Sequence, residues 1–268
     1  SKEAYAKSFA MQYRSNDAVT GVRLLEEYED GYYVIQNPPQ PVLERMELDD
    51  LYALHLRIKE QFPGVPLFLM GHSMGSFLAR TYIIKYPAEL TGAVICGTGH
   101  QVPALVAAGK AADGLVCRIK GTKHHSPLLS GMAFGSYNKA FEPKRTNSAW
   151  LSRDEAIVDA YEADPLCGFL PSAGLFRDMM EGIGFISDSK NIEKMRKTLP
   201  VLFISGDKDP VGEEGKGVQR AYEAFKAAGM RDVSIRFYKD CRHELLNELN
   251  RDEVMADVLS WFESRMPE

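Results

Sequence analysis

The sequence has few cysteines, no long apolar run and no excess of basic residues. Its four cysteines, Cys96, Cys117, Cys167 and Cys241, lack C-x-x-C spacing, which indicates neither a zinc site nor a disulfide framework. The longest apolar runs, such as residues 65–70, are far too short to span a bilayer. A net charge of −5 provides no electrostatic footprint for nucleic acid. We therefore expect no metal, no nucleic-acid partner and free thiols in a reducing cytoplasm.

The remaining composition is that of an ordinary globular protein. The 268 residues are 45% hydrophobic and 26% charged, which suits one large domain or a domain with an insertion. Residues 1–4 have no apolar core of the kind found in signal peptides, so we expect no secretory leader.

A strand, a tight turn and a helix are predicted around Ser73. Gly71, Ser73 and Gly75 form the pattern G-x-S-x-G between a buried strand at residues 65–70 and a helix at residues 77–86. A serine on so sharp a turn needs neighbours without bulk, and the helix start presents N–H groups to a developing oxyanion. The spacing predicts that Ser73 is a nucleophile.

Upstream of this turn the pattern is harder to interpret. Residues 22–28 and 32–36 flank Asp30-Gly31, which predicts a hairpin turn. Residues 43–62 have helical spacing, which Pro63-Gly64 ends.

Downstream, strands alternate with helices. We expect buried or alternating strands at residues 90–97, 199–205 and 233–238, and helices at residues 217–228 and 252–266. This alternation predicts an α/β fold with a mostly parallel, doubly wound sheet.

Between residues 101 and 195 the pattern changes to helical pieces without a strong strand. This segment is rich in aromatic residues, and we interpret it as a helical insertion. Its expected helices are residues 102–112, 115–119, 132–141, 153–163 and 175–186.

Polar residues follow the carboxyl ends of three predicted strands, in the chain order Ser73, Asp207/Asp209 and His243. Ligands of such sheets bind at these strand ends, and the order serine, aspartate, histidine is that of α/β-hydrolases. His243 would take the serine proton, and a carboxylate would orient its imidazole. Asp209 is preferred because it lies further past the strand end. Asp207 would instead help to form the turn.

The other histidines have weaker functional interpretations. His72 inside the turn is expected to bond locally or to line a substrate site, and His100 is a second substrate-binding candidate. His124 and His125 are expected on a surface loop. They have no cysteine or carboxylate at ligand spacing, so we predict no metal site.

Several of these motifs resemble the monoacylglycerol lipase and lysophospholipase branch of the α/β-hydrolases, often labelled serine aminopeptidase. The resemblance covers residues 56–268. The segments that carry it are residues 71–76 (GHSMGS), 205–212 (SGDKDPVG) and 241–248 (CRHELLNE), with cap-like stretches at 150–154 and 164–169.

The resemblance implies a triad of Ser73, Asp209 and His243, and it makes the Met74 backbone N–H one oxyanion donor. It also implies that residues 101–195 form a cap or lid over an acyl-chain pocket. The hydrolase core would then consist of residues 56–100 and 196–268, and no cofactor is expected.

Residues 1–55 depart from this family, whose members carry an upstream strand ending in His-Gly that supplies the second oxyanion N–H. Losing such a donor typically costs about 10²- to 10³-fold in rate. Three segments of the N-terminal part, residues 6–14, 36–41 and 47–54, instead resemble a radical-SAM protein. No cysteine precedes Cys96, so its cluster motif is absent. We expect an atypical N-terminus joined near residue 50, missing sheet strands and an exposed sheet edge that a hairpin or second subunit would cover.

The leading hypothesis is a serine hydrolase that cleaves carboxylic esters of monoacylglycerols or lysophospholipids through an acyl-enzyme. One alternative is an S33-type aminopeptidase, which would need an acidic group such as Glu155, Asp159 or Glu162 to hold the substrate amine. Another is a catalytically impaired homologue that acts as a binding protein. The sequence leaves the oligomeric state open.

Overall fold

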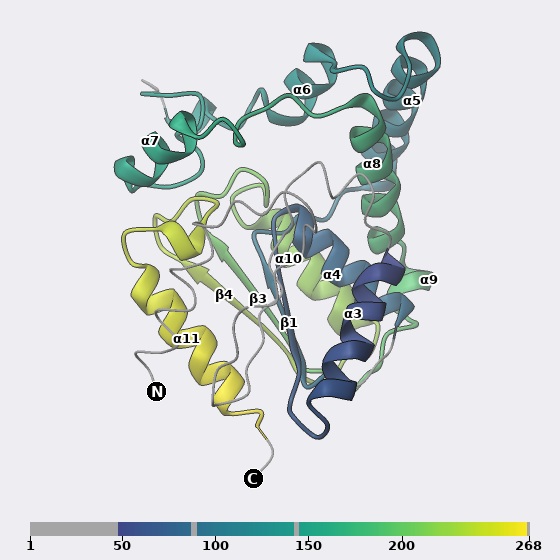
Figure 1. The fold of residues 1–268 in the computed structure, drawn as a ribbon, viewed down its shortest axis with the longest axis vertical. Coiled ribbons are helices and arrows are strands. Elements are labelled where there is room, and N and C mark those ends of the chain that lie inside the picture. The colour runs from purple at the N-terminus through teal and green to yellow at the C-terminus, as the bar shows by residue number, and fades with distance from the viewer. Residues whose placement is uncertain (1–47, 87–89, 142–144, 267–268) are drawn as a thin grey trace.

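A sheet of four parallel strands forms the centre of the protein in the computed structural model, which describes residues 48–86, 90–141 and 145–266 (Figure 1). The strand order is β1-β2-β3-β4. The strands are β1 Phe68–His72, β2 Gly92–Cys96, β3 Val201–Gly206 and β4 Val233–Tyr238. All neighbours are parallel, so the four carboxyl ends lie at the same edge of the sheet.

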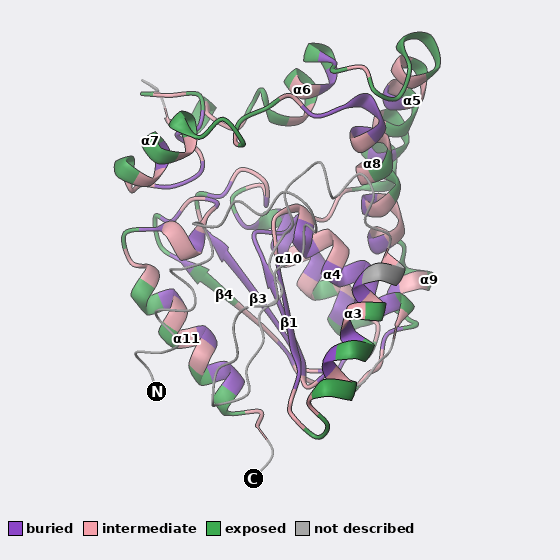
Figure 2. Cartoon of the chain, in the orientation of Figure 1, coloured by how far each residue is buried: buried purple, intermediate pink, exposed green. Residues whose placement is uncertain are grey.

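Helices cover both faces of this sheet, because its strands are apolar on both sides. Leu69 packs in one core cluster with the helices α3 (Leu48–Gln61), α4 (Met74–Lys85) and α10 (Lys216–Ala227). Phe68 packs in the other with α11 (Arg251–Glu263). Figure 2 shows strand residues buried between these layers, whereas β4 at the end of the sheet is partly exposed. The predicted doubly wound α/β fold is confirmed.

The chain between β2 and β3 contributes helices that lie beyond the carboxyl edge of the sheet (Figure 1). Helices α5 and α8 pack against each other, and α8 also contacts α4. The segment contains α5 Pro103–Lys120, α6 Pro127–Phe134, η1 Lys139–Phe141, α7 Glu155–Ala163, α8 Ala173–Ser187 and α9 Ser189–Ile192. We call the described residues from 101 to 195 the cap.

Helix α5 differs from the prediction of two separate pieces. It runs unbroken for 18 residues from Pro103 to Lys120, through Gly114. A Cβ atom at Gly114 would meet nothing within 4 Å, so this glycine marks no close packing or turn. A single glycine lowers helix stability by only about 1 kcal/mol relative to alanine, which packing against α8 can offset.

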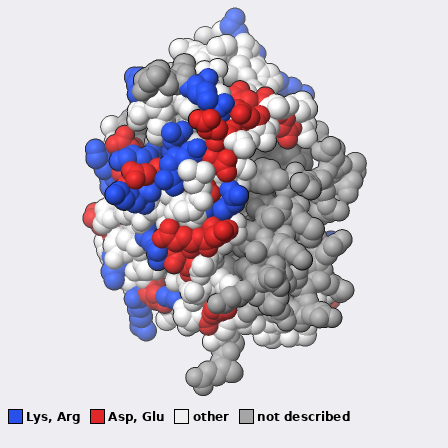
Figure 3. Space-filling view, turned by 90° about the vertical axis from the view of Figure 1, so that its left-hand side faces the viewer, with Lys and Arg blue, Asp and Glu red and all other residues white. Residues whose placement is uncertain are grey.

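Two further features of the described residues are their surface charge and the composition of their helices. Acidic and basic side chains are interspersed on the described part of the face in Figure 3. Among the described residues, no helix combines the length and the apolar character that a membrane crossing requires.

Strand β1, which precedes Ser73, occupies one end of the described sheet. It pairs with β2 from Phe68 to His72, and no other strand in the described ranges pairs with its second side. The hairpin predicted at residues 22–36 and most of the atypical N-terminal segment lie outside the described residues.

Candidate active site

Ser73 is the single residue between β1 and α4. The helix begins at Met74 and not at residue 77 as predicted, so the turn is tighter than the sequence pattern indicated. The backbone of Ser73 has φ 54° and ψ −123°, a conformation that non-glycine residues seldom adopt and that is associated with functional sites. Its N–H donates to the Cys96 carbonyl at 3.0 Å, which fixes the turn against the end of β2.

The glycine two residues before Ser73 is required by close packing. A Cβ atom at Gly71 would lie 2.2 Å from the carbonyl oxygen of Gly75 and 2.8 Å from the Cβ of Ala79. The end of β1 and the first turns of α4 therefore touch backbone to backbone, which allows the chain to reverse around Ser73.

Asp209 lies in the loop after β3 and is completely buried. Each of its carboxylate oxygens is 3.0 Å from Nδ1 of His243. The backbone N–H of Val211 donates to Oδ1 at 2.9 Å and so holds the carboxylate in place. Asp207 instead accepts the backbone N–H of Asp240 at 2.7 Å and joins two loops. The structure thus brings Asp209, and not Asp207, to the histidine.

The two side chains of this pair shift each other's pKa. Burial lowers the pKa of His243, but the charge and hydrogen bond of Asp209 raise it by more, so the net pKa lies above its usual value. Burial raises the pKa of Asp209, and the charge and hydrogen bond of His243 together with the Val211 N–H lower it below its usual value. The arrangement favours an ionised Asp209 that stabilises a protonated His243.

The histidine ring lies next to the Ser73 turn. A Cβ atom at Gly97 would be 3.1 Å from Cε1 of His243 and 3.3 Å from Cδ2 of His72, and the residue before Gly97 holds the Ser73 N–H. No hydrogen bond joins the Ser73 hydroxyl to the His243 ring among the described residues. Catalytic hydrogen bonds are often long in ligand-free enzymes and tighten when substrate binds.

His72 contacts both the ring and the backbone of His243. Its Nε2 lies 3.2 Å from the His243 carbonyl oxygen, and the two ring centroids are 4.6 Å apart. Burial, followed by the charge of His243, lowers the pKa of His72 to about 4. A neutral ring with a proton on Nε2 can donate to that carbonyl. His72 therefore supports the backbone of residues 239–244, between β4 and η2, which we call the histidine loop.

His100 belongs to a separate cluster around a buried arginine. Its Nδ1 is 3.1 Å from Nη2 of Arg80, and its carbonyl accepts from Arg220 at 2.8 Å. Burial, followed by the charge of Arg80, lowers the pKa of His100 to about 4. Arg80 also donates to the Ile186 carbonyl at 3.1 Å, so the cluster joins the loop after β2 to the end of α8.

Neither His124 nor His125 belongs to a metal-binding cluster. His125 is exposed, and its Nδ1 contacts the Leu170 carbonyl. Within the described ranges, no three histidine, cysteine or acidic side chains are grouped as metal ligands would be.

Trp150 of the cap contacts His243 directly, and the sequence offered no local signal for this. Its carbonyl accepts the backbone N–H of His243 at 3.4 Å, and the two ring centroids are 5.1 Å apart. From Trp150, neighbouring ring centroids continue through Tyr137 (4.9 Å) and Phe134 (5.7 Å) to Phe176 (5.9 Å). An aromatic row therefore leads from His243 into the cap.

Met74 is the first residue of α4, so its backbone N–H is one of the donors at a helix start that have no partner within the helix. This position next to Ser73 suits an oxyanion donor. The family's upstream His-Gly loop, which would supply a second donor, is not found in residues 1–55, and most of these residues lie outside the described part of the chain.

Known proteins resemble this chain over most of its length. The protein family described as serine aminopeptidase, S33, matches residues 45–250. A monoacylglycerol lipase of Mycolicibacterium smegmatis is 31% identical over 211 residues, which are 76% of this chain and 64% of the lipase. A crystal structure of a thermostable carboxyl esterase from Bacillus coagulans in complex with glycerol superposes with a TM-score of 0.76, at 27% identity, over 82% of this chain and 72% of the esterase.

The N-terminal part is similar to different proteins. The family described as radical SAM N-terminal matches residues 1–63. A UPF0313 protein of Clostridium botulinum is 42% identical over 53 residues, which are 20% of this chain and 8% of that protein. Both resemblances expected from the sequence are confirmed. The chain spans 64% of the length of the Mycolicibacterium smegmatis lipase and 62% of the length of a mouse monoglyceride lipase that it also matches.

Proposed function

The chain belongs to the serine aminopeptidase S33 family, and we propose that it hydrolyses carboxylic esters of monoacylglycerols or lysophospholipids through an acyl-enzyme. The observation that carries the proposal is the buried Asp209–His243 pair beside the strained turn of Ser73. The proposed reaction needs no cofactor.

In the proposed reaction, His243 takes the proton of Ser73 as the serine oxygen attacks the ester carbonyl. The Met74 N–H stabilises the resulting oxyanion, and Asp209 stabilises the imidazolium. His243 then returns the proton to the alcohol oxygen as the ester bond breaks. A water molecule, deprotonated by the same histidine, releases the acid from Ser73.

The contacts of the cap favour an apolar acyl group, rather than a free amino group, as the part of the substrate that is recognised. The aromatic row begins at His243 itself and so borders the reacting atoms. The acidic residues considered for an amine are already engaged. Glu155 and Asp159 pair with Arg145, and Glu162 accepts the Ser148 N–H at 3.1 Å.

The proposal includes a cytoplasmic location. All four cysteines are free thiols, and Cys96 and Cys241 are buried beside the proposed site. This usage suits the reducing cytoplasm.

A substrate panel tests the function. Purified protein is assayed with monoacylglycerols, lysophospholipids and p-nitrophenyl acyl esters, and in parallel with aminoacyl anilides. We expect turnover of the esters and little hydrolysis of the anilides. Faster cleavage of the anilides would favour the aminopeptidase alternative, and folded protein that cleaves neither class would favour a binding role.

The rate should depend on pH through His243. Only the neutral ring accepts the serine proton, and Asp209 raises the pKa of that ring. Activity should therefore rise with pH, with an apparent midpoint above the ordinary histidine value of about 6.5. His72 remains neutral across this range because its pKa is about 4.

The measurement is kcat/KM for a p-nitrophenyl ester between about pH 5 and 9, which reports the pKa of the free enzyme. A midpoint below the ordinary histidine value would contradict the pairing of His243 with an ionised Asp209.

A further inference from the structure

A buried carboxylate lies at the junction between the cap and the histidine loop. Glu248 is completely buried, just after the short helix η2 (Leu245–Asn247). Its Oε1 accepts the backbone N–H groups of Arg153 at 3.2 Å and Arg242 at 2.8 Å. Its Oε2 accepts Nε of Arg153 at 2.8 Å and the backbone N–H of Leu249 at 3.1 Å. These four donors occupy all the acceptor sites that an ionised carboxylate offers.

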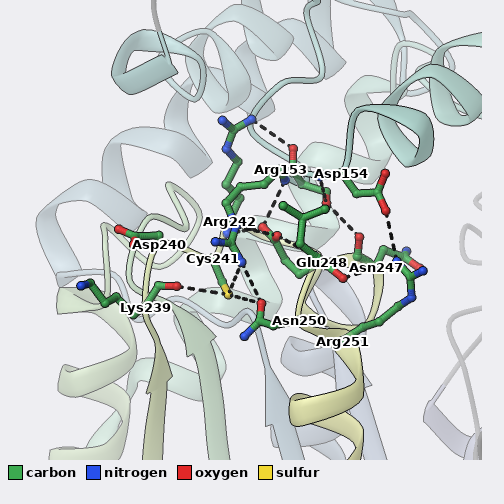
Figure 4. A network of polar contacts seen from close by, with 12 residues as sticks. Arg153, Asp154, Lys239, Asp240, Cys241, Arg242, Asn247, Glu248, Asn250 and Arg251 are labelled. Carbon is green, nitrogen blue, oxygen red and sulfur yellow. Dashed lines mark hydrogen bonds and ion pairs between the residues drawn. The ribbon is translucent and has the colours of Figure 1, made fainter.

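The two segments joined by this carboxylate are far apart in the chain. Arg153 belongs to the cap segment 149–153, which leads into α7, whereas Arg242 directly precedes His243. Figure 4 shows the Arg153 and Arg242 sides of the network meeting around Glu248. Arg153 also donates from Nη2 to Asn250 at 2.7 Å, so its guanidinium is held at two points.

Further hydrogen bonds join the same two segments, with donors on both sides. The Trp150 and Leu151 carbonyls accept the backbone N–H groups of His243 and Glu244 at 3.4 and 2.8 Å. The Ser152 hydroxyl donates to the Asn247 carbonyl at 2.8 Å. The Arg242 side chain donates to the carbonyls of Ala149 and Ser152. The cap segment therefore forms one wall against which the histidine loop is held.

We propose that Glu248 is a positioning residue that keeps His243 at Asp209 by fastening the cap segment 149–153 to the histidine loop. This inference rests on the proposed function. Glu248 itself contacts neither Ser73 nor Asp209 among the contacts of the described residues, so it acts only through the backbone on both sides of His243.

The charge and both oxygens of Glu248 are required by this geometry. A glutamine at this position would replace one acceptor oxygen with an NH₂ group. Because each oxygen accepts two N–H groups, either orientation of the amide places donor against donor. It would also leave Arg153 without its ionic partner in a largely buried network, in contrast to an exposed ion pair, which contributes little.

The test compares Glu248→Gln with Glu223→Gln, which makes the same change at an exposed carboxylate on α10 whose partner is Gln219. Active sites are counted with a fluorophosphonate probe. We expect Glu248→Gln to lower kcat per active site about 10²-fold, as expected for a small misplacement of a catalytic group, with little change in KM. Glu223→Gln should retain the wild-type kcat.

Proton NMR provides a readout that does not need turnover. The Nδ1 proton of His243, held between the ring and Asp209, should give a downfield resonance that Asp209→Asn removes. We expect this resonance to be lost or shifted in Glu248→Gln and unchanged in Glu223→Gln. The signal reports the position of His243 even if the wild-type protein cleaves no ester, so failure of this inference is distinguished from failure of the proposed function.

A milder variant covers the case in which Glu248→Gln does not fold. Arg153→Lys keeps the positive charge and the backbone N–H but loses the Nε–H bond to Glu248. It should lower kcat about 10-fold and shift the same resonance. A folded Glu248→Gln or Arg153→Lys protein with wild-type kcat and an unshifted resonance would overturn the proposal.

Discussion

Replacing Ser73 with alanine is expected to lower kcat for ester hydrolysis by about 10⁴-fold or more, because the acyl-enzyme cannot form without the serine oxygen. The strained backbone of Ser73 supports this expectation: φ of 54° is held by the Cys96 carbonyl and by the close contact of Gly71 with Gly75. The measurement is the hydrolysis of a p-nitrophenyl ester together with covalent labelling by a fluorophosphonate. The variant should show neither burst nor label.

An exposed serine of the cap provides the matched control. Ser136→Ala makes the same chemical change on the protein surface, away from the Ser73 turn, and should retain wild-type labelling and kcat. Equal unfolding midpoints of the two variants in urea would show that the loss is chemical. Labelling of the Ser73→Ala protein at wild-type stoichiometry would assign the nucleophile to another residue.

Replacing Asp209 with asparagine is expected to lower kcat by about 10⁴-fold, the size of effect known for the corresponding change in a serine protease triad. The carboxylate faces Nδ1 of His243 with both oxygens at 3.0 Å and no exposure to water. An amide there donates a hydrogen bond in one orientation and lacks charge in both, so it favours the wrong tautomer and no longer stabilises the imidazolium. Because Asp209 raises the pKa of His243, the midpoint of the pH profile should also fall.

Asp207→Asn is the control for this change, since the two aspartates share one loop. Its Oδ1 accepts the Asp240 N–H, a contact that the side-chain oxygen of asparagine can keep. We expect at most a few-fold loss of kcat, in line with a peripheral turn contact. A larger loss in Asp207→Asn than in Asp209→Asn, measured as kcat with the same ester, would reverse the assignment.

Strands and helices with clear periodicity were predicted well from the sequence. The strand at Val233–Tyr238 has the bounds predicted, and β3 differs by two residues at its start and by one at its end. Short-range side-chain patterns predict these elements, because the spacing of apolar residues along the sequence indicates whether one or both faces of an element are buried. The boundaries near Ser73 and in α5 were wrong, since glycine either permits a tight turn or is simply tolerated in a helix, and the sequence does not distinguish the two.

The supports of the proposed site could not be predicted. Trp150 and Arg153 reach the His243 loop from about a third of the chain away, and no local pattern marks such contacts. Glu248 belongs to a segment that carried the family resemblance. Its partner Arg153 comes from the cap, however, and the contact depends on how the cap packs against the histidine loop. His72 likewise proved to hold the His243 backbone.

The sequence alone establishes the α/β alternation, the Ser73 turn and the order of serine, aspartate and histidine along the chain. All three follow from spacing between near neighbours and from the rule that parallel strands end at one edge of a sheet. The folded chain was needed to decide that Asp209 rather than Asp207 faces His243, and that the cap segment 149–153 and Glu248 hold the histidine loop. Those decisions depend on contacts between segments brought together by burial of the core, where distance along the chain carries no information about distance in space.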